Sequence, residues 1–234
     1  MTSELGEQRH SRAADAELIT DPILKAEAEA QNGLRQYDLG LQIIHEAIDR
    51  GPAYKLRLSK ILALQREALN GISSYAGNFR PASVAIEGSK HEPPGAHLVP
   101  ELVEGLCDYI NENWDKTALH LAAYAMWRLN WIHPFSDGNG RTSRILSYII
   151  LCARVGAVLP GVPTIPDQIV DNRKPYFDAL DAADDAWAEG RLDISKMESL
   201  LESLLARQLT SAFAQAGGRV DPTAGQPEPS SGTN

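Results

Sequence analysis

The sequence lacks several features that would assign it to a broad class. No run approaches the roughly twenty apolar residues of a membrane-spanning helix, and the polar start has no apolar core of a secretory signal peptide. Only two cysteines occur, Cys107 and Cys152, without the spacing of a metal site or a disulfide framework. We therefore expect no membrane segment, two reduced and buried thiols, and a cytoplasmic location.

Positive charge is also scarce. The 234 residues include 22 Lys and Arg against 31 Asp and Glu, which gives a net charge of −9. Because a nucleic-acid surface needs clustered cations, we expect no nucleic-acid partner. A local group of arginines on such an acidic chain is better suited to a small anionic ligand.

What the sequence does contain is helical periodicity over most of its length, with 43% hydrophobic residues to form a core. The helix 138–155 is apolar nearly all round beyond Arg144, which predicts a central and buried position. Spacing and caps predict helices at 22–30, 34–48, 55–69, 99–114, 117–130, 138–155, 172–188 and 195–215.

One stretch differs from this pattern. Between 73 and 94, glycines and prolines surround a short β-branched run, Val84-Ala85-Ile86, which predicts a short strand or hairpin arm. We therefore predict an all-α domain with one small β-hairpin excursion. The expected organisation is a flexible N-terminus at 1–20, a single helical domain at 21–215 with its hairpin at about 79–94, and a disordered tail at 216–234.

The chemical signal is the segment His133-Pro-Phe-Ser-Asp-Gly-Asn-Gly-Arg-Thr-Ser-Arg144. His133 lies where a helix ends, and a neutral imidazole, with an unperturbed pKa of about 6.5, can accept a proton. The turn Gly138-Asn139-Gly140 opens the next helix, where converging backbone N–H groups and the helix dipole favour phosphate oxygens. Arg141 and Arg144 share one helix face, and their forked donors match phosphate geometry.

Two interpretations of Asp137 stand beside each other: the carboxylate caps the helix, or it binds Mg²⁺ that bridges phosphates. With two arginines and an anion-binding turn beside it, we favour Mg²⁺. For the segment as a whole, an ordinary helix stop followed by solvated arginines explains each residue separately. That interpretation does not explain why all of them lie together.

The segment resembles the signature of the Fic (filamentation induced by cyclic AMP) family, His-Pro-Phe-x-(Asp/Glu)-Gly-Asn-Gly-Arg-x-x-Arg, with every fixed position present. The stretch Leu119–Asn130, the run Val84–Gly88 and the helix with Arg173, Tyr176 and Phe177 are similar as well, so the resemblance covers roughly residues 20–210. It implies an all-α Fic fold with a β-hairpin flap. The implied reaction transfers a nucleoside monophosphate, usually AMP from ATP, to a Tyr, Ser or Thr hydroxyl of a target protein.

The resemblance also implies roles for residues. His133 would be the general base, Asp137 would bind Mg²⁺ on the phosphates, and the Gly138–Gly140 backbone with Asn139 would form the anion hole. Arg141 and Arg144 would hold the β- and γ-phosphates. The implied nucleotide-binding set is Asp137, Gly138, Asn139, Gly140, Arg141, Thr142, Ser143, Arg144, Tyr176 and Phe177. The flap residues Val84, Ala85, Ile86, Glu87 and Gly88 would align the target by strand addition.

Several alternatives remain open from the sequence. Tyr176 either contacts the base or packs its helix, and Asp184, where some relatives have asparagine, can alter base or ribose preference. Gly140 stands where phosphoryl-transferring relatives have lysine, which favours nucleotidyl transfer. The donor could instead be UTP or GTP, or the protein could be a non-catalytic nucleotide-binding regulator. Glu29 is a weak match to the family's inhibitory glutamate; an antitoxin chain, a homodimer partner or self-modification are the other partner hypotheses.

Overall fold

The computed structural model describes residues 11–12 and 17–218. The helices are α1 (Pro22–Arg50), α2 (Leu58–Leu69), α3 (Val99–Glu112), α4 (Ala118–Ile132), α5 (Asn139–Val155), α6 (Ile165–Asp171), α7 (Lys174–Ala188) and α8 (Ser195–Gln215). The strands β1 (Ser11–Arg12) and β2 (Ala85–Ile86) are two residues each. The predicted all-α class is confirmed.

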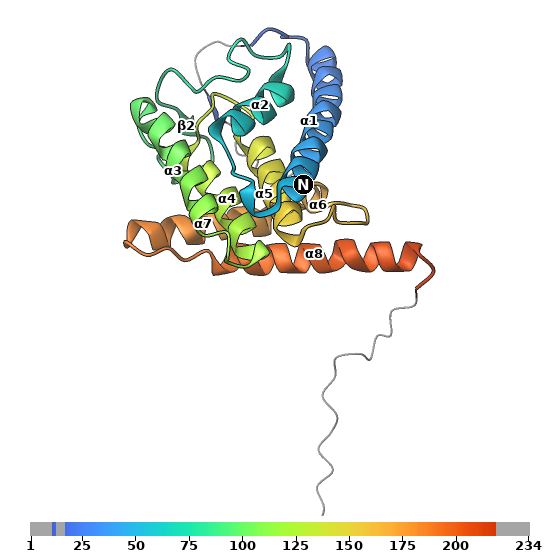
Figure 1. Ribbon diagram of the computed structural model, residues 1–234. Helices are drawn as coiled ribbons and strands as arrows, with labels where there is room; N and C mark the ends of the chain where they lie inside the picture. Colours follow the sequence, from blue (N-terminus) through green and yellow to red (C-terminus); the bar gives the residue numbers. More distant parts are fainter. Residues whose placement is uncertain (1–10, 13–16, 219–234) are drawn as a thin grey trace, which may run out of the picture.

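Helix α5 lies at the centre of the bundle, as its apolar composition predicts. It packs against α4, α1, α2 and α6. Helix α8 runs across one end of the bundle, at the bottom of Figure 1, and contacts α4, α6 and α7. Leu146 and Ile149 of α5 are fully buried. The start of α5, where Arg141 and Arg144 lie, is thus held by the most enclosed helix of the protein.

Helix α1 is one continuous helix of 29 residues, whereas the sequence suggested two helices with a break near Asn32-Gly33. Asp21 caps it, since its carboxylate accepts from the N–H groups of Ile23 at 2.9 Å and Leu24 at 3.0 Å. The prediction of a break was wrong because Asn32 is fully buried. Its amide nitrogen donates to carbonyl oxygens at the end of α2 instead of ending its own helix.

Two other boundaries differ from the prediction. Helix α2 begins three residues later than expected. The side chain of Asn111 binds the backbone of Leu56, with N···Oδ1 at 2.8 Å and O···Nδ2 at 2.9 Å, and Arg57 is extended before the helix starts. Helix α6 was not predicted, since it has only seven residues. A capping box between Thr164 and Asp167 starts it, and Gln208 of α8 accepts from the N–H of Ile165 at 3.0 Å.

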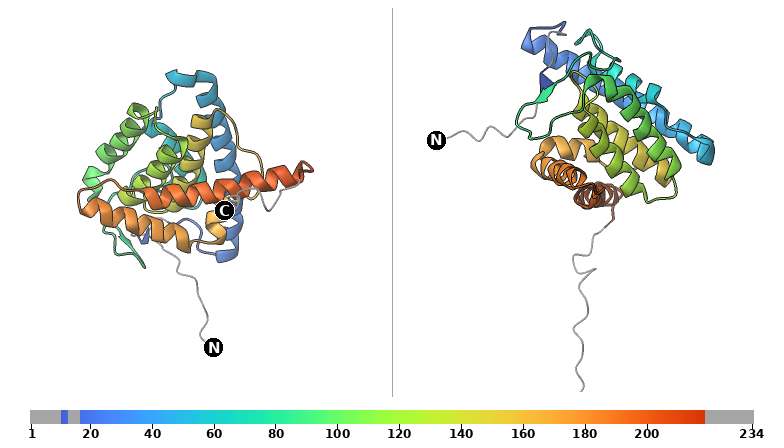
Figure 2. Two further views of the ribbon diagram at one scale, coloured as in Figure 1. Left: turned by 90° about the horizontal axis from the view of Figure 1, so that it is seen from below. Right: turned by 90° about the vertical axis from the view of Figure 1, so that its left-hand side faces the viewer.

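The predicted strand is present at Ala85–Ile86, but its partner is not a second arm of the same segment. Strand β2 pairs antiparallel with β1, far away in sequence (Figure 2). The glycine and prolines after Ile86 prevent a returning arm, because proline lacks the N–H that a ladder needs. The flap is therefore a single strand within an irregular loop and not a hairpin closed on itself.

The termini and cysteines complete the comparison with the prediction. Of the predicted flexible N-terminus, residues 1–10 and 13–16 lie outside the described part, as do residues 219–234 of the predicted tail. Cys107 and Cys152 are both buried free thiols, as predicted. Within the described part of the chain, none of the helices combines the length and apolar character needed to cross a membrane.

We predict that Asn32→Ala lowers the free energy of unfolding by about 1–3 kcal/mol, because the buried carbonyl oxygen of Ala68 and the partly buried one of Asn70 lose their donor. Urea denaturation checks this value. The exposed neighbour Gln31 is the matched control, and Gln31→Ala should stay within about 0.5 kcal/mol of the wild type. Equal losses in the two variants would contradict the structural role of Asn32.

Candidate active site

His133 occupies a strained turn directly after α4. Its backbone has φ 49° and ψ 58°, in the left-handed region, and it is the one non-glycine residue with positive φ in the described part of the chain. The following Pro134 further restricts this residue. Histidine tolerates the left-handed region better than branched residues do. Strain of this kind collects at functional sites, where surrounding contacts maintain it.

The ring of His133 is buried and lacks normal hydrogen-bond partners. His133 is 7% exposed, and neither ring nitrogen makes a hydrogen bond of ordinary geometry within the described part of the chain. Burial lowers its pKa from 6.5 to about 4, an effect that the backbone of Asn130 partly opposes and the charge of Arg80 reinforces. The imidazole is therefore neutral at pH 7 and able to accept a proton.

Arg80 joins this turn to the flap. The residue is only 2% exposed. Its Nε donates to the carbonyl oxygen of His133 at 2.7 Å, and its own N–H donates to the carbonyl of Pro134 at 2.9 Å. Nη1 donates to the carbonyl of Ala82 at 2.9 Å, and Nη2 donates to the carbonyl of Pro94. One guanidinium thus holds the histidine turn and both ends of the flap loop together.

The turn from Phe135 to the start of α5 is fixed by Asn139. Its Oδ1 accepts from the N–H of Phe135 at 3.0 Å, and its Nδ2 donates to the carbonyl of Phe135 at 2.8 Å. Both side-chain groups are therefore used inside the protein. Any contribution of Asn139 to an anion hole must come from its backbone N–H, together with that of Gly140 in the first turn of the helix.

Two glycines shape this helix start. Gly138 has φ 81°, a conformation that suits glycine, and it precedes the first residue of α5. Gly140 has ordinary torsions, but a Cβ placed on it would lie 3.1 Å from Nη1 of Arg144. The absence of a side chain at position 140 therefore leaves room for the Arg144 guanidinium beside the backbone.

The two motif arginines have different partners. Arg141 lies 3.4 Å from the Asp137 carboxylate and 3.5 Å from that of Glu29 on α1. Arg144 pairs with no carboxylate in the described part of the chain, and burial lowers its pKa. It lies beside the hydroxyl of Tyr176, which favours its charged form. Arg144 is thus the cation with room for an external anion.

Two cavities meet at these residues. The arginine-lined cavity is bordered by Lys25, Ala26, Glu29, Ala30, His133, Asp137, Gly138, Asn139, Gly140, Arg141, Arg144, Val170 and Arg173. The aromatic-lined cavity is bordered by Ile86, Ser89, His91, Asn130, His133, Gly140, Arg144, Arg173, Tyr176, Phe177, Leu180 and Asp184. They share four residues, His133, Gly140, Arg144 and Arg173. A ligand with a polyanionic end and a planar apolar end fits these two joined cavities.

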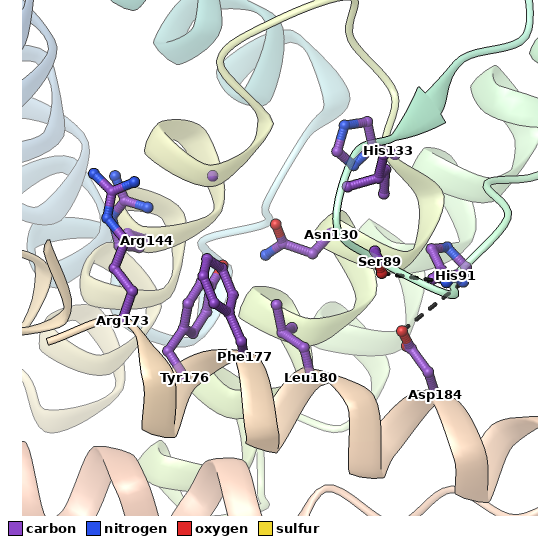
Figure 3. Close-up of a pocket in the computed structure, with 12 residues that line it drawn as sticks. Ser89, His91, Asn130, His133, Arg144, Arg173, Tyr176, Phe177, Leu180 and Asp184 are labelled. Carbon is purple, nitrogen blue, oxygen red and sulfur yellow. Dashed lines mark hydrogen bonds and ion pairs between the residues drawn. The ribbon is translucent and has the colours of Figure 1, made fainter. Parts of the chain in front are cut away.

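Figure 3 shows the arrangement within the aromatic-lined cavity. Arg144 and Arg173 lie at one end, Tyr176, Phe177 and Leu180 follow along α7, and Asp184 lies at the other end. At that end Asp184 Oδ1 accepts from the indole N–H of Trp127 at 2.8 Å, and Oδ2 lies 3.8 Å from Nδ1 of His91. The charge therefore changes from positive to acidic along the cavity.

Not every predicted site residue reaches a cavity. Thr142 and Ser143 are fully buried and line neither one. Helical geometry is the reason, because positions 141 and 144 share a face and the two residues between them point toward the core. In the flap, Ile86 alone of the five predicted residues lines the aromatic-lined cavity. Ala85, Glu87 and Gly88 are exposed, and Val84 is half-buried.

The sequence did not identify Arg80, Arg173, Lys25 or His91 as parts of the site. Arg173 borders both cavities, and Lys25 borders the arginine-lined one. Their side chains come from segments distant from the motif, and no local spacing distinguishes them from solvated basic residues. A signal was available only for Arg80, as an isolated cation next to the apolar Phe79 in a loop.

The expected magnesium site can be tested on the residues present. No group of three or more His, Cys, Asp or Glu residues in the described part of the chain could hold a metal ion. Mg²⁺ often takes one or two carboxylates and completes its shell with phosphate oxygens and water. Asp137 supplies one carboxylate at the edge of the arginine-lined cavity. The residues therefore fit a metal that arrives with a phosphate ligand and not one held by protein alone.

The chain is similar to proteins of one known family. The family model described as "Fic/DOC family" matches residues 55–151, which include the flap and the motif. A protein named "Protein adenylyltransferase Fic" from Drosophila willistoni is 33% identical over 152 residues, or 63% of this chain and 29% of that protein. One of the same name from Culex quinquefasciatus is 32% identical over 133 residues, or 56% of this chain and 25% of that protein.

Solved structures show the same fold. A Fic domain containing signaling protein from Bacteroides thetaiotaomicron has a TM-score of 0.63 and 26% identity, covering 81% of this chain and 74% of that one. Fic-1 from C. elegans has a TM-score of 0.60 and 21% identity, covering 84% and 55%. The chain spans less than a third of the length of the curated relatives named above.

The depressed pKa of His133 predicts an acid-sensitive contribution to stability. The unfolded chain binds a proton at this residue near pH 6.5, and the folded chain does so only near pH 4. As the pH falls through that window, wild type should lose up to about 3 kcal/mol of unfolding free energy relative to His133→Asn, and it should lose none above pH 7. Asparagine is suited to the left-handed turn. The unfolding free energies are measured by urea denaturation at each pH. If wild type and His133→Asn showed the same pH dependence, the burial of a neutral imidazole would be contradicted.

Proposed function

This chain belongs to the Fic/DOC family, and from that premise we propose that it is a protein adenylyltransferase, which transfers AMP from ATP to a hydroxyl group of a protein. The observation that carries the proposal is the position of His133, whose neutral ring borders both the arginine-lined and the aromatic-lined cavity. The names of relatives more than 30% identical support the same reaction. A reducing, cytosolic setting is part of the proposal, in accord with the two free thiols.

In the proposed reaction, the oxygen of a target hydroxyl forms a bond with the α-phosphorus of ATP, and the bond from that phosphorus to the bridging oxygen breaks. Pyrophosphate leaves, and His133 takes the hydroxyl proton. Such a displacement depends on positioning and on stabilising the charge of the leaving group more than on covalent chemistry by the protein. Arg144, Arg141 and the first N–H groups of α5 are the groups available to stabilise that charge.

Mg²⁺ bound with the nucleotide would neutralise phosphate charge, with Asp137 as its protein ligand. The other roles follow from the cavities. Arg144 and Arg173 border the junction where the phosphate chain would end and the nucleoside begin. The rings of Tyr176 and Phe177, whose centroids lie 5.5 Å apart, would contact the base or ribose. Asp184 at the far end supplies an acceptor for an N–H of the base, and competition by unlabelled ATP, GTP and UTP would rank the donors.

Labelled ATP measures the reaction directly. We predict that full-length protein with Mg²⁺ and a lysate labels target proteins, and that His133→Ala reduces labelling by about 10²- to 10⁴-fold. The exposed His97 is the matched control, and His97→Ala should label as the wild type does. Equal labelling by wild type and His133→Ala would exclude His133 as the base. Nucleotide binding without labelling by any variant would support the non-catalytic regulator instead.

Glu29 provides a second test. Its carboxylate borders the arginine-lined cavity and pairs with Arg141, whereas the inhibitory glutamate of the family resemblance would pair with the second arginine, Arg144. A triphosphate in this cavity would be repelled by that carboxylate and would compete with it for Arg141. Because the pair is partly exposed, the effect should be modest.

We predict that Glu29→Gln lowers the Kd for MgATP by about two- to fivefold, as calorimetry can measure. Glu27, an exposed residue of the same helix that borders neither cavity, is the control, and Glu27→Gln should leave the Kd unchanged. A Kd unaffected by Glu29→Gln would show that the Glu29–Arg141 pair does not oppose nucleotide binding.

A further inference from the structure

Lys25 is a cation of the arginine-lined cavity that has no role in the proposed reaction. It is a half-buried residue near the start of α1, a helix that packs against α5 (Figure 1). Glu29 lies 3.5 Å from Arg141, and a Cβ placed on Gly40 would lie 3.2 Å from Cδ1 of Ile145. The two helices therefore run in the same direction. Lys25, one helical turn before Glu29, is level with the turn that precedes α5.

The two cavities set the direction in which a nucleotide would lie. The four residues that border both cavities mark the place of the α-phosphorus, because His133 is one of them. With the base in the aromatic-lined cavity, the β- and γ-phosphates extend into the arginine-lined cavity. Of these two cavities, Lys25 borders only the arginine-lined one. Lys25 is therefore on the side of the terminal phosphate.

The motif arginines leave a need for a further cation on that side. Arg141 lies 3.4 Å from the Asp137 carboxylate and 3.5 Å from that of Glu29, so two negative charges already oppose its own. Arg144 borders both cavities, which places it near the middle of the phosphate chain. A terminal phosphate adds negative charge beyond Arg144, and a cation at that end would stabilise it.

Lys25 has a partly exposed partner that a phosphate could replace. Its ammonium forms an ion pair with Glu17, whose backbone bridges to Ser73. The two side chains are 33% and 45% exposed, and ion pairs as exposed as this contribute little stability. The hydrogen bond to Glu17 raises the pKa of Lys25, and the charges of Glu17, Asp137 and Glu29 act in the same direction, so the ammonium is charged at neutral pH. Its flexible stem allows it to turn from one acceptor to another.

We propose that Lys25 binds the terminal phosphate of the donor, and that it thereby makes the site select a nucleoside triphosphate over a diphosphate. The inference rests on the proposed function. The ammonium leaves the Glu17 carboxylate and donates to an oxygen of the γ-phosphate, while Arg141 and Arg144 bind the rest of the phosphate chain. Glu17 is then a competitor for Lys25 within the protein, and the same contact stabilises the charge of the departing pyrophosphate.

Calorimetry of the full chain with MgATP and MgADP tests the proposal, because ADP lacks only the terminal phosphate. Lys25→Met removes the charge and keeps the length of the side chain. We expect this variant to raise the Kd for MgATP by about five- to twentyfold and to leave the Kd for MgADP within about twofold of wild type. Lys25→Arg keeps the positive charge and should stay within about threefold of wild type for both nucleotides.

Lys60 is the matched control. It forms a similarly exposed ion pair, with Glu46 at 2.6 Å, and it borders neither cavity. Lys60→Met should leave both Kd values unchanged. Retained MgADP binding shows that Lys25→Met is folded. Equal losses of affinity for MgATP and MgADP in Lys25→Met would overturn the proposal, since Lys25 would then not distinguish the terminal phosphate from the rest of the chain.

The failure of this inference differs from the failure of the proposed function. If wild type labels lysate proteins and Lys25→Met binds MgATP as tightly as wild type does, Lys25 does not bind the terminal phosphate, and the adenylyltransferase proposal is unaffected. If wild type binds neither nucleotide and labels no protein, both proposals are wrong.

Discussion

The buried guanidinium of Arg80 is the interaction on which the site depends. Its hydrogen-bond partners in the described part of the chain are carbonyl oxygens, from His133 and from both ends of the flap loop. A buried cation is stabilised when its donors are all satisfied. Here those donors maintain the left-handed turn at His133, and they set the distance between the histidine and the flap. The same positive charge helps to keep the imidazole neutral.

The strongest sequence signals were local, and the structure bears them out. Examples are the cap at Asp21, the glycine before α5 and the apolar character of α5. Each of these features depends only on residues that are close in the sequence. What the sequence could not indicate depends on contacts between distant segments. Asn32 looks like a helix stop until the carbonyl oxygens that accept from its amide are seen at the end of α2, and Arg80 looks like a loop cation until its carbonyl partners are known.

The motif illustrates the same limit at a finer scale. The sequence placed His133, Asp137, Arg141 and Arg144 near one another, and they border one cavity. It did not separate them from Thr142 and Ser143, which the helix directs into the core. Nor could it show that Asn139 uses both side-chain groups on Phe135. A motif indicates which residue types a site requires. Which of them face the cavity and which pack in the core depends on their positions around the helix.

Gly140 links the size of one side chain to the reach of another. A methyl group there would approach the terminal nitrogen of Arg144, the flexible end of a long side chain, and not the backbone. The fold could therefore accommodate a small residue at this position while the guanidinium moved by a few tenths of an ångström. A single substitution at Gly140 could therefore change how Arg144 binds the proposed leaving group while the helical core stays the same. The chemistry of such a scaffold can diverge without compensating substitutions in its core.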